Sequence, residues 1–332
     1  PHVMSLGVHR PTRLVTNEEV AHRTAVPADW IEKRSGIVSR RFCGPDESLE
    51  SMAVSAGTLA LTAAGISPAQ VDCVILATSS YLTQTPPLAP RLAHLLGTTA
   101  AGAFDLKAAC AGFSLALTAA ADYIRAGSAR LVLVIGAEQY SSITDHTDRS
   151  TAMLFADGAG AAVVGTGEGS GIGPVAWGSD CTAWEALTTP SWLEFVGQPQ
   201  APPPVIRMDG RALLRSILRH APDVVGRALA GAGVGLADLA AFIPHQANGR
   251  IIDMLAEQLG LPGHVVIARD VTETGNTSAA SIPLAIEWLL RDGSAKKGDL
   301  ALLFGFGAGL TYAGQLIELP GAVRTNDSGG PS

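Results

Sequence analysis

The stretch Asp105-Leu-Lys-Ala-Ala-Cys-Ala-Gly-Phe113 immediately precedes a long Ala- and Leu-rich segment, and Cys110 stands at the junction. The apolar spacing after it predicts a buried helix over residues 110–126. A helix N-terminus stabilises an anion through its unpaired N–H groups and the helix dipole. We therefore expect a thiolate-prone Cys110, which is typical of a nucleophile near neutral pH. A small buried core residue is the competing interpretation of a lone cysteine on an apolar helix.

Outward from this junction, short β-branched and aliphatic runs alternate with Ala-rich helical stretches. This alternation is typical of an α/β protein with buried sheets. Strands are predicted over residues 71–77, 131–137, 159–165, 239–243, 265–267, 300–304 and 312–317. Helices are predicted over residues 48–64, 110–126, 210–230, 249–259 and 278–291.

The chain has 332 residues, which exceeds a typical single domain and suggests two halves around one large core. Phe155-Ala-Asp-Gly-Ala-Gly160 is echoed by Phe304-Gly-Phe-Gly-Ala-Gly309, and each is followed by an apolar strand. A Gly-rich passage over residues 165–173 separates the two. We therefore expect halves at 1–168 and 169–322, with a flexible tail at 323–332.

Composition excludes several classes of protein. A hydrophobic share of 47% against 16% charged residues indicates a globular chain, and a net charge of -7 argues against general nucleic-acid binding. The four cysteines are scattered without a Cys-x-x-Cys pair, so neither a metal site nor a disulfide framework is expected. With no signal peptide and no membrane span apparent, we expect a cytoplasmic protein with reduced thiols and no cofactor.

Two further polar residues stand where chemistry is expected. His245 follows an apolar strand in Pro244-His-Gln-Ala-Asn248, and active sites of open α/β sheets gather at such strand ends. Asn276 lies in Thr274-Gly-Asn-Thr-Ser-Ala-Ala-Ser-Ile-Pro283, where polar residues turn abruptly into a helix. A simple helix cap is the alternative interpretation of Asn276.

The order Cys110, His245, Asn276 is also the chain order of papain-like cysteine proteases, so a thiol hydrolase is one hypothesis. The Cys-Gly-Ser-Cys-Trp type of surround is missing, and the cysteine is central to the chain. A hydrolase uses its Asn to orient the imidazole, whereas a decarboxylating enzyme can use His and Asn side by side as donors.

Four motifs carry a family resemblance: Ala109-Cys-Ala-Gly-Phe113, Pro244-His-Gln-Ala-Asn248, Gly275-Asn-Thr-Ser-Ala-Ala-Ser-Ile-Pro283 and Gly305-Phe-Gly-Ala-Gly309. Together they resemble β-ketoacyl-acyl-carrier-protein synthase III. The stretches Gln84-Thr-Pro-Pro87 and Trp177-Gly-Ser179 are most similar to the actinobacterial branch. The resemblance implies a five-layered αβαβα thiolase fold with two pseudo-symmetric halves, and a homodimeric acyltransferase.

The resemblance also implies a two-stage reaction. An acyl-CoA would esterify Cys110, and malonyl-acyl carrier protein would then lose CO2 and attack that thioester to give a 3-oxoacyl carrier protein. The backbone N–H groups of Cys110 and Ala308 would form the oxyanion hole. His245 and Asn276 would stabilise the enolate. Many relatives carry Gly at the position of Ala308, so strain is expected there if φ is positive.

Binding residues are implied in the same way. Trp30 and Arg149 would flank the CoA adenine, with Arg34 near a phosphate. The loop around Thr85 would reach the acyl pocket of the partner subunit. The lining residues of that pocket would be Leu154, Phe155, Leu187 and Trp192.

A row of arginines suggests a second surface. Arg211, Arg215 and Arg219 recur every four residues, so on a helix they form one basic stripe opposite Leu213 and Ile217. Most such stripes are merely solvated. In a chain of net charge -7, Arg211 and Arg215 together with Arg250 offer a docking surface for an acidic carrier protein.

Three other hypotheses stay open beside the condensing enzyme that starts fatty-acid or polyketide assembly. One is an acyltransferase of the same fold that passes the Cys110 acyl group on without decarboxylation, and another is the thiol hydrolase. A non-catalytic binding module is the third. The presence of Asn276 favours condensation, because a pure transferase has no enolate to stabilise. The preferred acyl group and the role of Lys107 do not follow from the sequence.

Overall fold

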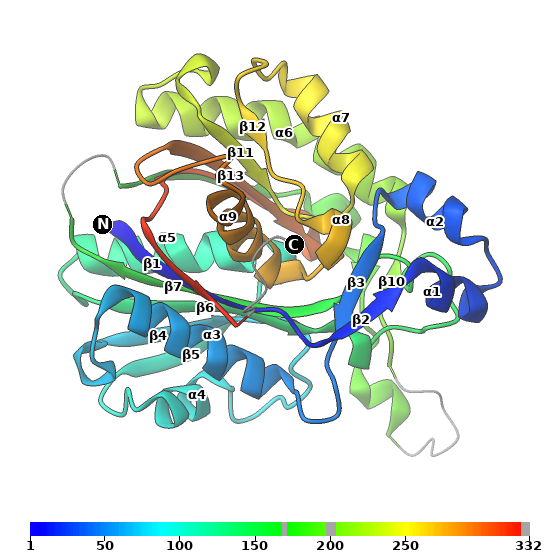
Figure 1. The fold of residues 1–332 in the computed structure, drawn as a ribbon, viewed down its shortest axis with the longest axis horizontal. Helices are drawn as coiled ribbons and strands as arrows, with labels where there is room; N and C mark the ends of the chain where they lie inside the picture. Colours follow the sequence, from blue (N-terminus) through cyan, green and yellow to red (C-terminus); the bar gives the residue numbers. More distant parts are fainter. Residues whose placement is uncertain (168–170, 197–203, 327–332) are drawn as a thin grey trace.

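The computed structural model describes residues 1–167, 171–196 and 204–326, and two β-sheets dominate these residues (Figure 1). In the described part, one sheet has six strands in the order β15-β1-β7-β6-β4-β5 and the other has five in the order β12-β11-β13-β14-β8. Two short ladders, β2 with β3 and β9 with β10, lie outside them. The strands are β1 His2–His9, β2 Arg13–Thr16, β3 Ser39–Phe42, β4 Cys73–Ala77, β5 Gly102–Leu106, β6 Val132–Gln139, β7 Asp157–Gly165, β8 Ile172–Ser179, β9 Leu187–Thr188, β10 Arg207–Met208, β11 Ala241–Pro244, β12 Val266–Ile267, β13 Leu300–Gly307, β14 Thr311–Glu318 and β15 Ala322–Thr325.

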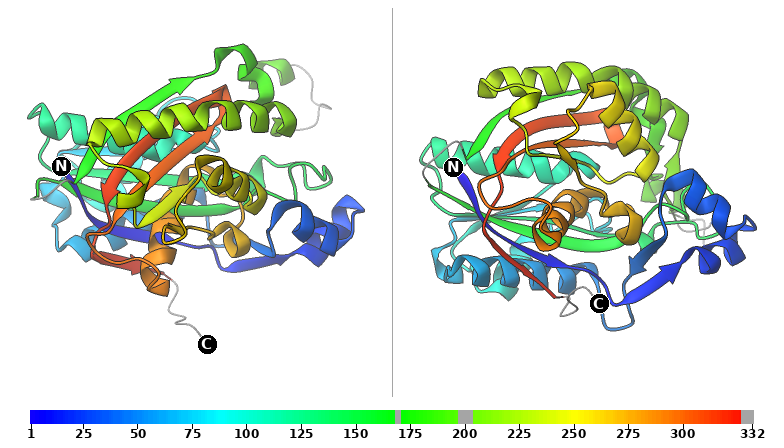
Figure 2. Two further views of the ribbon diagram at one scale, coloured as in Figure 1. Left: turned by 90° about the horizontal axis from the view of Figure 1, so that it is seen from above. Right: turned by 45° about the horizontal axis from the view of Figure 1, so that its top comes forward.

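Helices form three layers around the two sheets (Figures 1 and 2). The α-helices are α1 Asn17–Thr24, α2 Ala28–Ser35, α3 Leu49–Ala64, α4 Ala89–Leu96, α5 Gly112–Arg125, α6 Gly210–Ala232, α7 Gly249–Leu259, α8 Val271–Thr274 and α9 Ser281–Asp292. Short 3-10 turns include η2 Ala109–Ala111, η7 Ser278–Ala280 and η8 Ala308–Leu310. α5 and α9 pack between the sheets, α3 and α4 cover the outer face of the first sheet, and α6 and α7 cover that of the second. The five-layered αβαβα arrangement is confirmed.

Strand periodicity explains how one sheet serves two layers. In β6, Val132 and Val134 belong to the central core with α5, whereas Leu133 and Ile135 belong to the outer core with α3. Successive side chains of a strand point to opposite faces, so a run that is apolar at every position is buried on both. This is why continuous apolar runs, without alternation, marked the sheet strands in the sequence.

The two sheets repeat one topology. β4 pairs in parallel with β5 and β6, and β7 pairs antiparallel with β6 and β1. In the same way, β11 pairs in parallel with β12 and β13, and β14 pairs antiparallel with β13 and β8. α5 lies between β5 and β6 in the chain, as α9 lies between β12 and β13. The halves are therefore pseudo-symmetric.

The segment predicted to be a flexible tail from residue 323 is in part a strand. Residues Ala322–Thr325 form β15, which pairs in parallel with β1, and Asn326 hydrogen-bonds to the backbone of Arg10 through its side chain. The prediction failed there because β15 forms by pairing with β1, more than 300 residues away, which the local sequence does not reveal. The rest of the predicted tail, residues 327–332, lies outside the described part. Across that described part, no helix combines the length and apolarity that crossing a membrane requires.

A buried ion cluster fastens the first half of the chain to the second. Arg10, just after β1, donates to Glu287 Oε2 of α9 at 2.6 Å and to Asp270 Oδ1 at 3.0 Å. The three side chains are only 2–4% exposed. Such a cluster is weak evidence for net stability, but removing one partner leaves buried charge without compensation.

We predict that Arg10→Met lowers the free energy of unfolding by about 3–5 kcal/mol, because the buried Asp270 carboxylate then loses its cation and Glu287 is left with Arg291, at 3.6 Å. Urea unfolding monitored by circular dichroism measures the change. Arg91→Met is the matched control, since Arg91 pairs with Glu50 at the surface and its loss leaves the midpoint nearly unchanged. Equal midpoints for the two variants would contradict the prediction.

Candidate active site

Cys110 lies in η2, at the entrance to α5, in the layer between the sheets. The preceding Ala109 adopts a φ of 48°, a left-handed value that is uncommon for a residue with a Cβ. The end of β13 comes very close: a Cβ added to Gly307 would lie 2.7 Å from the Cys110 backbone nitrogen. Gly at position 307 therefore lets the loop after β13 approach the cysteine.

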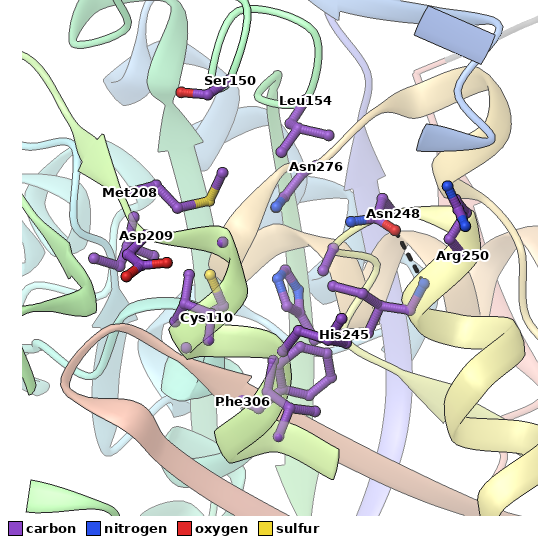
Figure 3. A pocket seen from close by; sticks show the side chains of 18 of the residues that line it. Cys110, Ser150, Leu154, Met208, Asp209, His245, Asn248, Arg250, Asn276 and Phe306 are labelled. Atoms are coloured by element: carbon purple, nitrogen blue, oxygen red, sulfur yellow. Dashed lines mark hydrogen bonds between the residues drawn. The ribbon is translucent and has the colours of Figure 1, made fainter. Parts of the chain in front are cut away.

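The structure brings Cys110, His245 and Asn276 to one pocket of about 660 Å³ (Figure 3). They come from distant parts of the chain: from η2, from the end of β11 and from the turn before η7. In Figure 3 the amide nitrogen of Asn276 points toward Cys110 and the ring of His245. All three residues are buried, with exposed fractions of 2–5%.

The hydrogen bonds around His245 indicate its tautomer. Nδ1 lies 2.7 Å from Ser281 Oγ, and the backbone N–H of Gln246 donates to the same oxygen at 3.3 Å. Because that oxygen accepts from Gln246, the Ser281 hydroxyl can donate a hydrogen bond to an unprotonated Nδ1, and Nε2 then carries the ring hydrogen. Burial lowers the pKa of His245 to about 3, so the ring is neutral near pH 7. His245 is therefore suited to be a neutral donor through Nε2.

Asn276 is oriented by its own local turn. Its Oδ1 accepts the backbone N–H of Ser278 at 2.9 Å. Its backbone is fixed by bonds to Leu154 O and from Ala156 N, each 2.9 Å. Asn276 is not the N-cap of the following turn, which is Thr277; its oxygen instead closes a local turn onto Ser278, and this bond leaves the amide nitrogen directed toward the pocket. Two N–H donors, one from His245 and one from Asn276, can meet a single substrate oxygen.

Comparison with known proteins agrees with this geometry. Residues 104–181 match the model of the family described as 3-oxoacyl-[acyl-carrier-protein] synthase III, and residues 229–319 match the model of its C-terminal part. The chain is 47% identical to β-ketoacyl-[acyl-carrier-protein] synthase III of Streptomyces lividans, over 97% of this chain and 96% of that protein. It is 46% identical to the mycobacterial enzyme of the same name from Mycobacterium avium, over 96% and 95%. The chain belongs to the β-ketoacyl-acyl-carrier-protein synthase III family.

Solved structures agree with the assignment to the synthase III family. The priming β-ketosynthase of the R1128 polyketide pathway superimposes with a TM-score of 0.94 at 46% identity, over 97% of this chain and 96% of that one. The 3-oxoacyl-(acyl carrier protein) synthase III of Pseudomonas aeruginosa gives a TM-score of 0.89 at 37% identity, over 95% and 97%. The fold is accordingly the thiolase-like fold of this synthase family.

The cysteine of this synthase III chain is a thiol at rest. Burial raises the pKa of Cys110 to about 12; the Ser278 side chain lowers it, and the buried Glu138 carboxylate raises it further. The expectation of a thiolate near neutral pH is therefore wrong. It failed because burial outweighs the hydrogen bonds from the Ser278 side chain and the Cys110 backbone N–H, and the burial of Cys110 is set by tertiary packing.

Two of the three predicted docking arginines and one of the predicted CoA-binding residues reach the pocket wall. Arg34, Arg211 and Arg250 line it, whereas Trp30, Arg149 and Arg215 are exposed residues outside the lining. Trp30 is 37% exposed on α2, the same helix as Arg34. Stacking of Trp30 and Arg149 on an adenine stays a prediction.

The predicted acyl-pocket residues have three different outcomes. Leu154, Phe155 and Leu187 line the pocket. Thr85 is exposed within the single chain, in the loop that carries the cis Thr85-Pro86 bond, so its predicted place in a partner subunit is untested. The side chain of Trp192 lies outside the described part of the structure.

Ala308 begins η8 and does not line the pocket, although its neighbour Gly307 does. Among the described residues, the non-glycine positions with positive φ are Ala25, Ala109, Ser278 and Leu310. Ala308 is not one of them, so the expected strain is absent. An oxyanion hole from the N–H groups of Cys110 and Ala308 stays a prediction.

Sequence reasoning missed part of the pocket wall. Asn248 stood inside one of the family motifs and was not singled out, and Phe306, whose ring centroid is 5.0 Å from that of His245, stood inside another. Met208 and Asp209 gave no motif signal; Asp209 caps α6 by accepting from Arg211 N and Ala212 N. Within residues 1–167, 171–196 and 204–326, no His, Cys, Asp or Glu cluster could hold a metal ion.

We predict that carbamidomethylation of Cys110 by iodoacetamide accelerates steadily from pH 7 to pH 10, about tenfold per unit, because only the thiolate reacts and the pKa is about 12. Peptide mapping by mass spectrometry separates this rate from that of Cys181, which is exposed. A Cys181→Ser variant removes that competing site. A rate that levels off below pH 8 would restore the thiolate interpretation.

Proposed function

We propose that the chain condenses an acyl group, carried as a thioester on Cys110, with malonyl-acyl carrier protein. The observation that carries this proposal is the single pocket shared by a buried thiol and two neutral N–H donors. The names of its relatives, β-ketoacyl-[acyl-carrier-protein] synthase III and a priming β-ketosynthase, support the same reaction. The product is a 3-oxoacyl carrier protein that starts fatty-acid or polyketide assembly.

The first stage is thioester exchange. The Cys110 sulfur attacks the carbonyl of an acyl-CoA, the carbonyl–sulfur bond to CoA breaks, and CoA departs with the thiol proton. Negative charge develops on the carbonyl oxygen, and we place it beside the N–H groups of Cys110 and Ala308. The acyl chain then lies along Leu154, Phe155 and Leu187, which line the pocket.

The second stage is decarboxylation and carbon–carbon bond formation. The bond between the malonyl carboxylate and its α-carbon breaks, CO2 leaves, and the electron pair forms a thioester enolate. His245 Nε2–H and the Asn276 amide donate to the enolate oxygen. The α-carbon attacks the Cys110 thioester, and Cys110 leaves and takes up a proton. The neutral His245 and Asn276 donors suit this stage because they form no ion pair with the malonyl carboxylate, which would stabilise it against loss as CO2.

Substrate entry is proposed to use the basic mouth of the pocket. Arg34 on α2 lies at the wall, and Trp30 from the same helix and Arg149 would hold the CoA adenine. A homodimer would bring the loop of Thr85 to the acyl pocket of the partner subunit. CoA enters as a thioester substrate, and the proposal needs no metal.

We predict that Cys110→Ala abolishes acylation by acyl-CoA, because it removes the sulfur that bonds to the acyl group. His245→Ala and Asn276→Ala should still acylate but should release CO2 from malonyl-acyl carrier protein about 10²-fold more slowly, since each removes an enolate donor. Intact-mass spectrometry follows the acyl adduct, and labelled CO2 follows decarboxylation.

His264→Ala serves as the control, because His264 is exposed, lies outside the pocket lining and hydrogen-bonds to the carbonyl of Ala237. An adduct that transfers unextended to another acceptor would instead favour an acyltransferase. Acyl release to water, with no malonyl donor needed, would favour the hydrolase.

The outer face of α6 is the proposed docking surface for the carrier protein. Arg211, Arg215 and Arg219 are exposed there, whereas Leu213 and Ile217 on the opposite face are buried. Arg211 and Arg250 also line the pocket, so the surface continues to its mouth. Gln258 of α7 donates to Leu218 O at 2.8 Å, which holds the two helices together. A carrier protein docked on this face could deliver its thioester directly into the pocket.

We predict that Arg215→Glu and Arg250→Glu each raise the KM for malonyl-acyl carrier protein by about tenfold at low salt, because each inverts a charge that attracts an acidic partner. Steady-state condensation assays at about 20 mM and 500 mM salt measure it, and the difference should shrink at high salt. Arg227→Glu is the matched control on the same helix, where Arg227 pairs with Asp223. An unchanged KM at low salt in both variants would exclude this surface.

A further inference from the structure

A buried carboxylate lies beside the pocket without being part of its wall. Glu138, near the end of β6, is 0% exposed and is not a lining residue. Burial raises its pKa, and hydrogen bonds from neighbouring donors oppose that rise. Burying a carboxylate costs free energy unless its oxygens accept hydrogen bonds. The donors around Glu138 therefore indicate which parts of the chain it connects.

The donors reach Glu138 from two directions. On one side, Thr78 Oγ1 donates at 3.1 Å, and the backbone N–H groups of Ser79 and Ser80 each donate to Oε2 at 3.0 Å. The Ser80 hydroxyl adds a further bond to the same oxygen. On the other side, Ser278 Oγ donates to Oε1 at 3.0 Å. Glu138 therefore ties the turn after β4 to the turn that carries Asn276.

Ser278 is the link between the carboxylate and the pocket. Its hydroxyl donates to Glu138, while its backbone N–H donates to Asn276 Oδ1 at 2.9 Å. Its φ is 48°, a left-handed value that costs on the order of 1 kcal/mol for a residue with a Cβ and persists only where surrounding contacts hold it. β6 also presses against this turn, because a Cβ on Gly136 would lie 2.4 Å from Ala279 O.

We infer that Glu138 is a positioning residue of the condensation: by fixing Ser278, it aims the Asn276 amide at the enolate oxygen. The inference rests on the proposed function. A carboxylate only accepts, so all of its donors point inward and Ser278 has one orientation. A glutamine in its place turns one oxygen into an N–H₂ group that faces those donors, and Ser278 loses its fixed acceptor.

The experiment measures the two stages of the reaction separately. Glu138→Gln should slow CO2 release from malonyl-acyl carrier protein at least tenfold in kcat with little change in KM, because Asn276 is still present but misaimed. Acylation of Cys110 by acyl-CoA should not become slower in Glu138→Gln, since it does not use the Asn276 amide and the lost carboxylate had raised the pKa of Cys110. Ser278→Ala removes the same hydroxyl link and should slow CO2 release from the acylated protein to the same extent; its acylation rate is a separate readout, because the Ser278 side chain lowers the pKa of Cys110. The double variant should be no worse than either single variant, because the two residues act as one unit.

A matched control separates positioning from general stability. Asp157 on β7 is also a 0% exposed carboxylate on the strand next to β6, and its bonds go to Ser141 and to Cys43 N. Asp157→Asn should lower the unfolding midpoint while leaving the ratio of the two rates unchanged. Glu138→Asp, which keeps the charge, should recover part of the decarboxylation rate.

The outcomes are distinct. Normal CO2 release in folded Glu138→Gln, equal loss in both stages, or multiplying losses in the double variant would overturn the inference. If Glu138→Gln does not fold, Ser278→Ala decides the question by its rate of CO2 release from protein that is already acylated. Wild-type protein that acylates but never releases CO2 would refute the proposed condensation itself. A Glu138→Gln variant that releases CO2 at the wild-type rate would refute only the role of Glu138.

Discussion

Two helix N-termini meet between the sheets, and the arrangement of the pocket depends on that meeting. η2 contacts η7, so the turn that leads into α5 lies against the turn that leads into α9. Cys110 lies within η2, and Asn276 lies two residues before the start of η7. His245 joins them because Ser281, the first residue of α9, hydrogen-bonds its ring. A thiol and two donors thus converge although the chain separates them widely, and rigid helices hold each in place.

Equivalent positions in the two pseudo-symmetric halves carry chemically different side chains. Ala109 and Ser278, in equivalent turns, both adopt a φ of 48°. The strand pairings place Ala77 against Gly136 and Pro244 against Phe304, so Glu138 in the first half corresponds to Phe306 in the second. Phe306 packs against the ring of His245, and Glu138 binds Thr78, the residue that follows Ala77. This position is therefore occupied by an apolar ring, Phe306, next to the neutral imidazole of His245. In the other half it is occupied by a carboxylate, Glu138, which accepts hydrogen bonds from hydroxyl and N–H donors.

Much of the fold could be predicted because its strands are continuous apolar runs. β4, β6, β7, β11, β13 and β14 were all expected within a few residues, and α7 over its full extent. β8 was missed because Gly173, Pro174 and Gly178 interrupt its apolar character. β5 was missed because its burial is partial and it contains Asp105.

The three reactive residues of the pocket were foreseeable from motifs, whereas the protonation state of Cys110 was not, since burial is a property of the assembled layers. Met208 and Asp209 gave no pattern because only the start of α6 brings them to the wall.

The strand β15 makes the order of synthesis relevant to folding. β1 precedes the other strands in the chain, yet one of its two neighbours is β15, residues Ala322–Thr325, which leave the ribosome after all other strands of the two sheets (Figure 2). Throughout translation, β1 therefore presents an unpaired row of N–H and C=O groups, which is the type of edge that recruits foreign strands. That edge of β1 is closed only when residues Ala322–Thr325 pair with it, so the completed sheet has one edge fewer for a foreign strand to join.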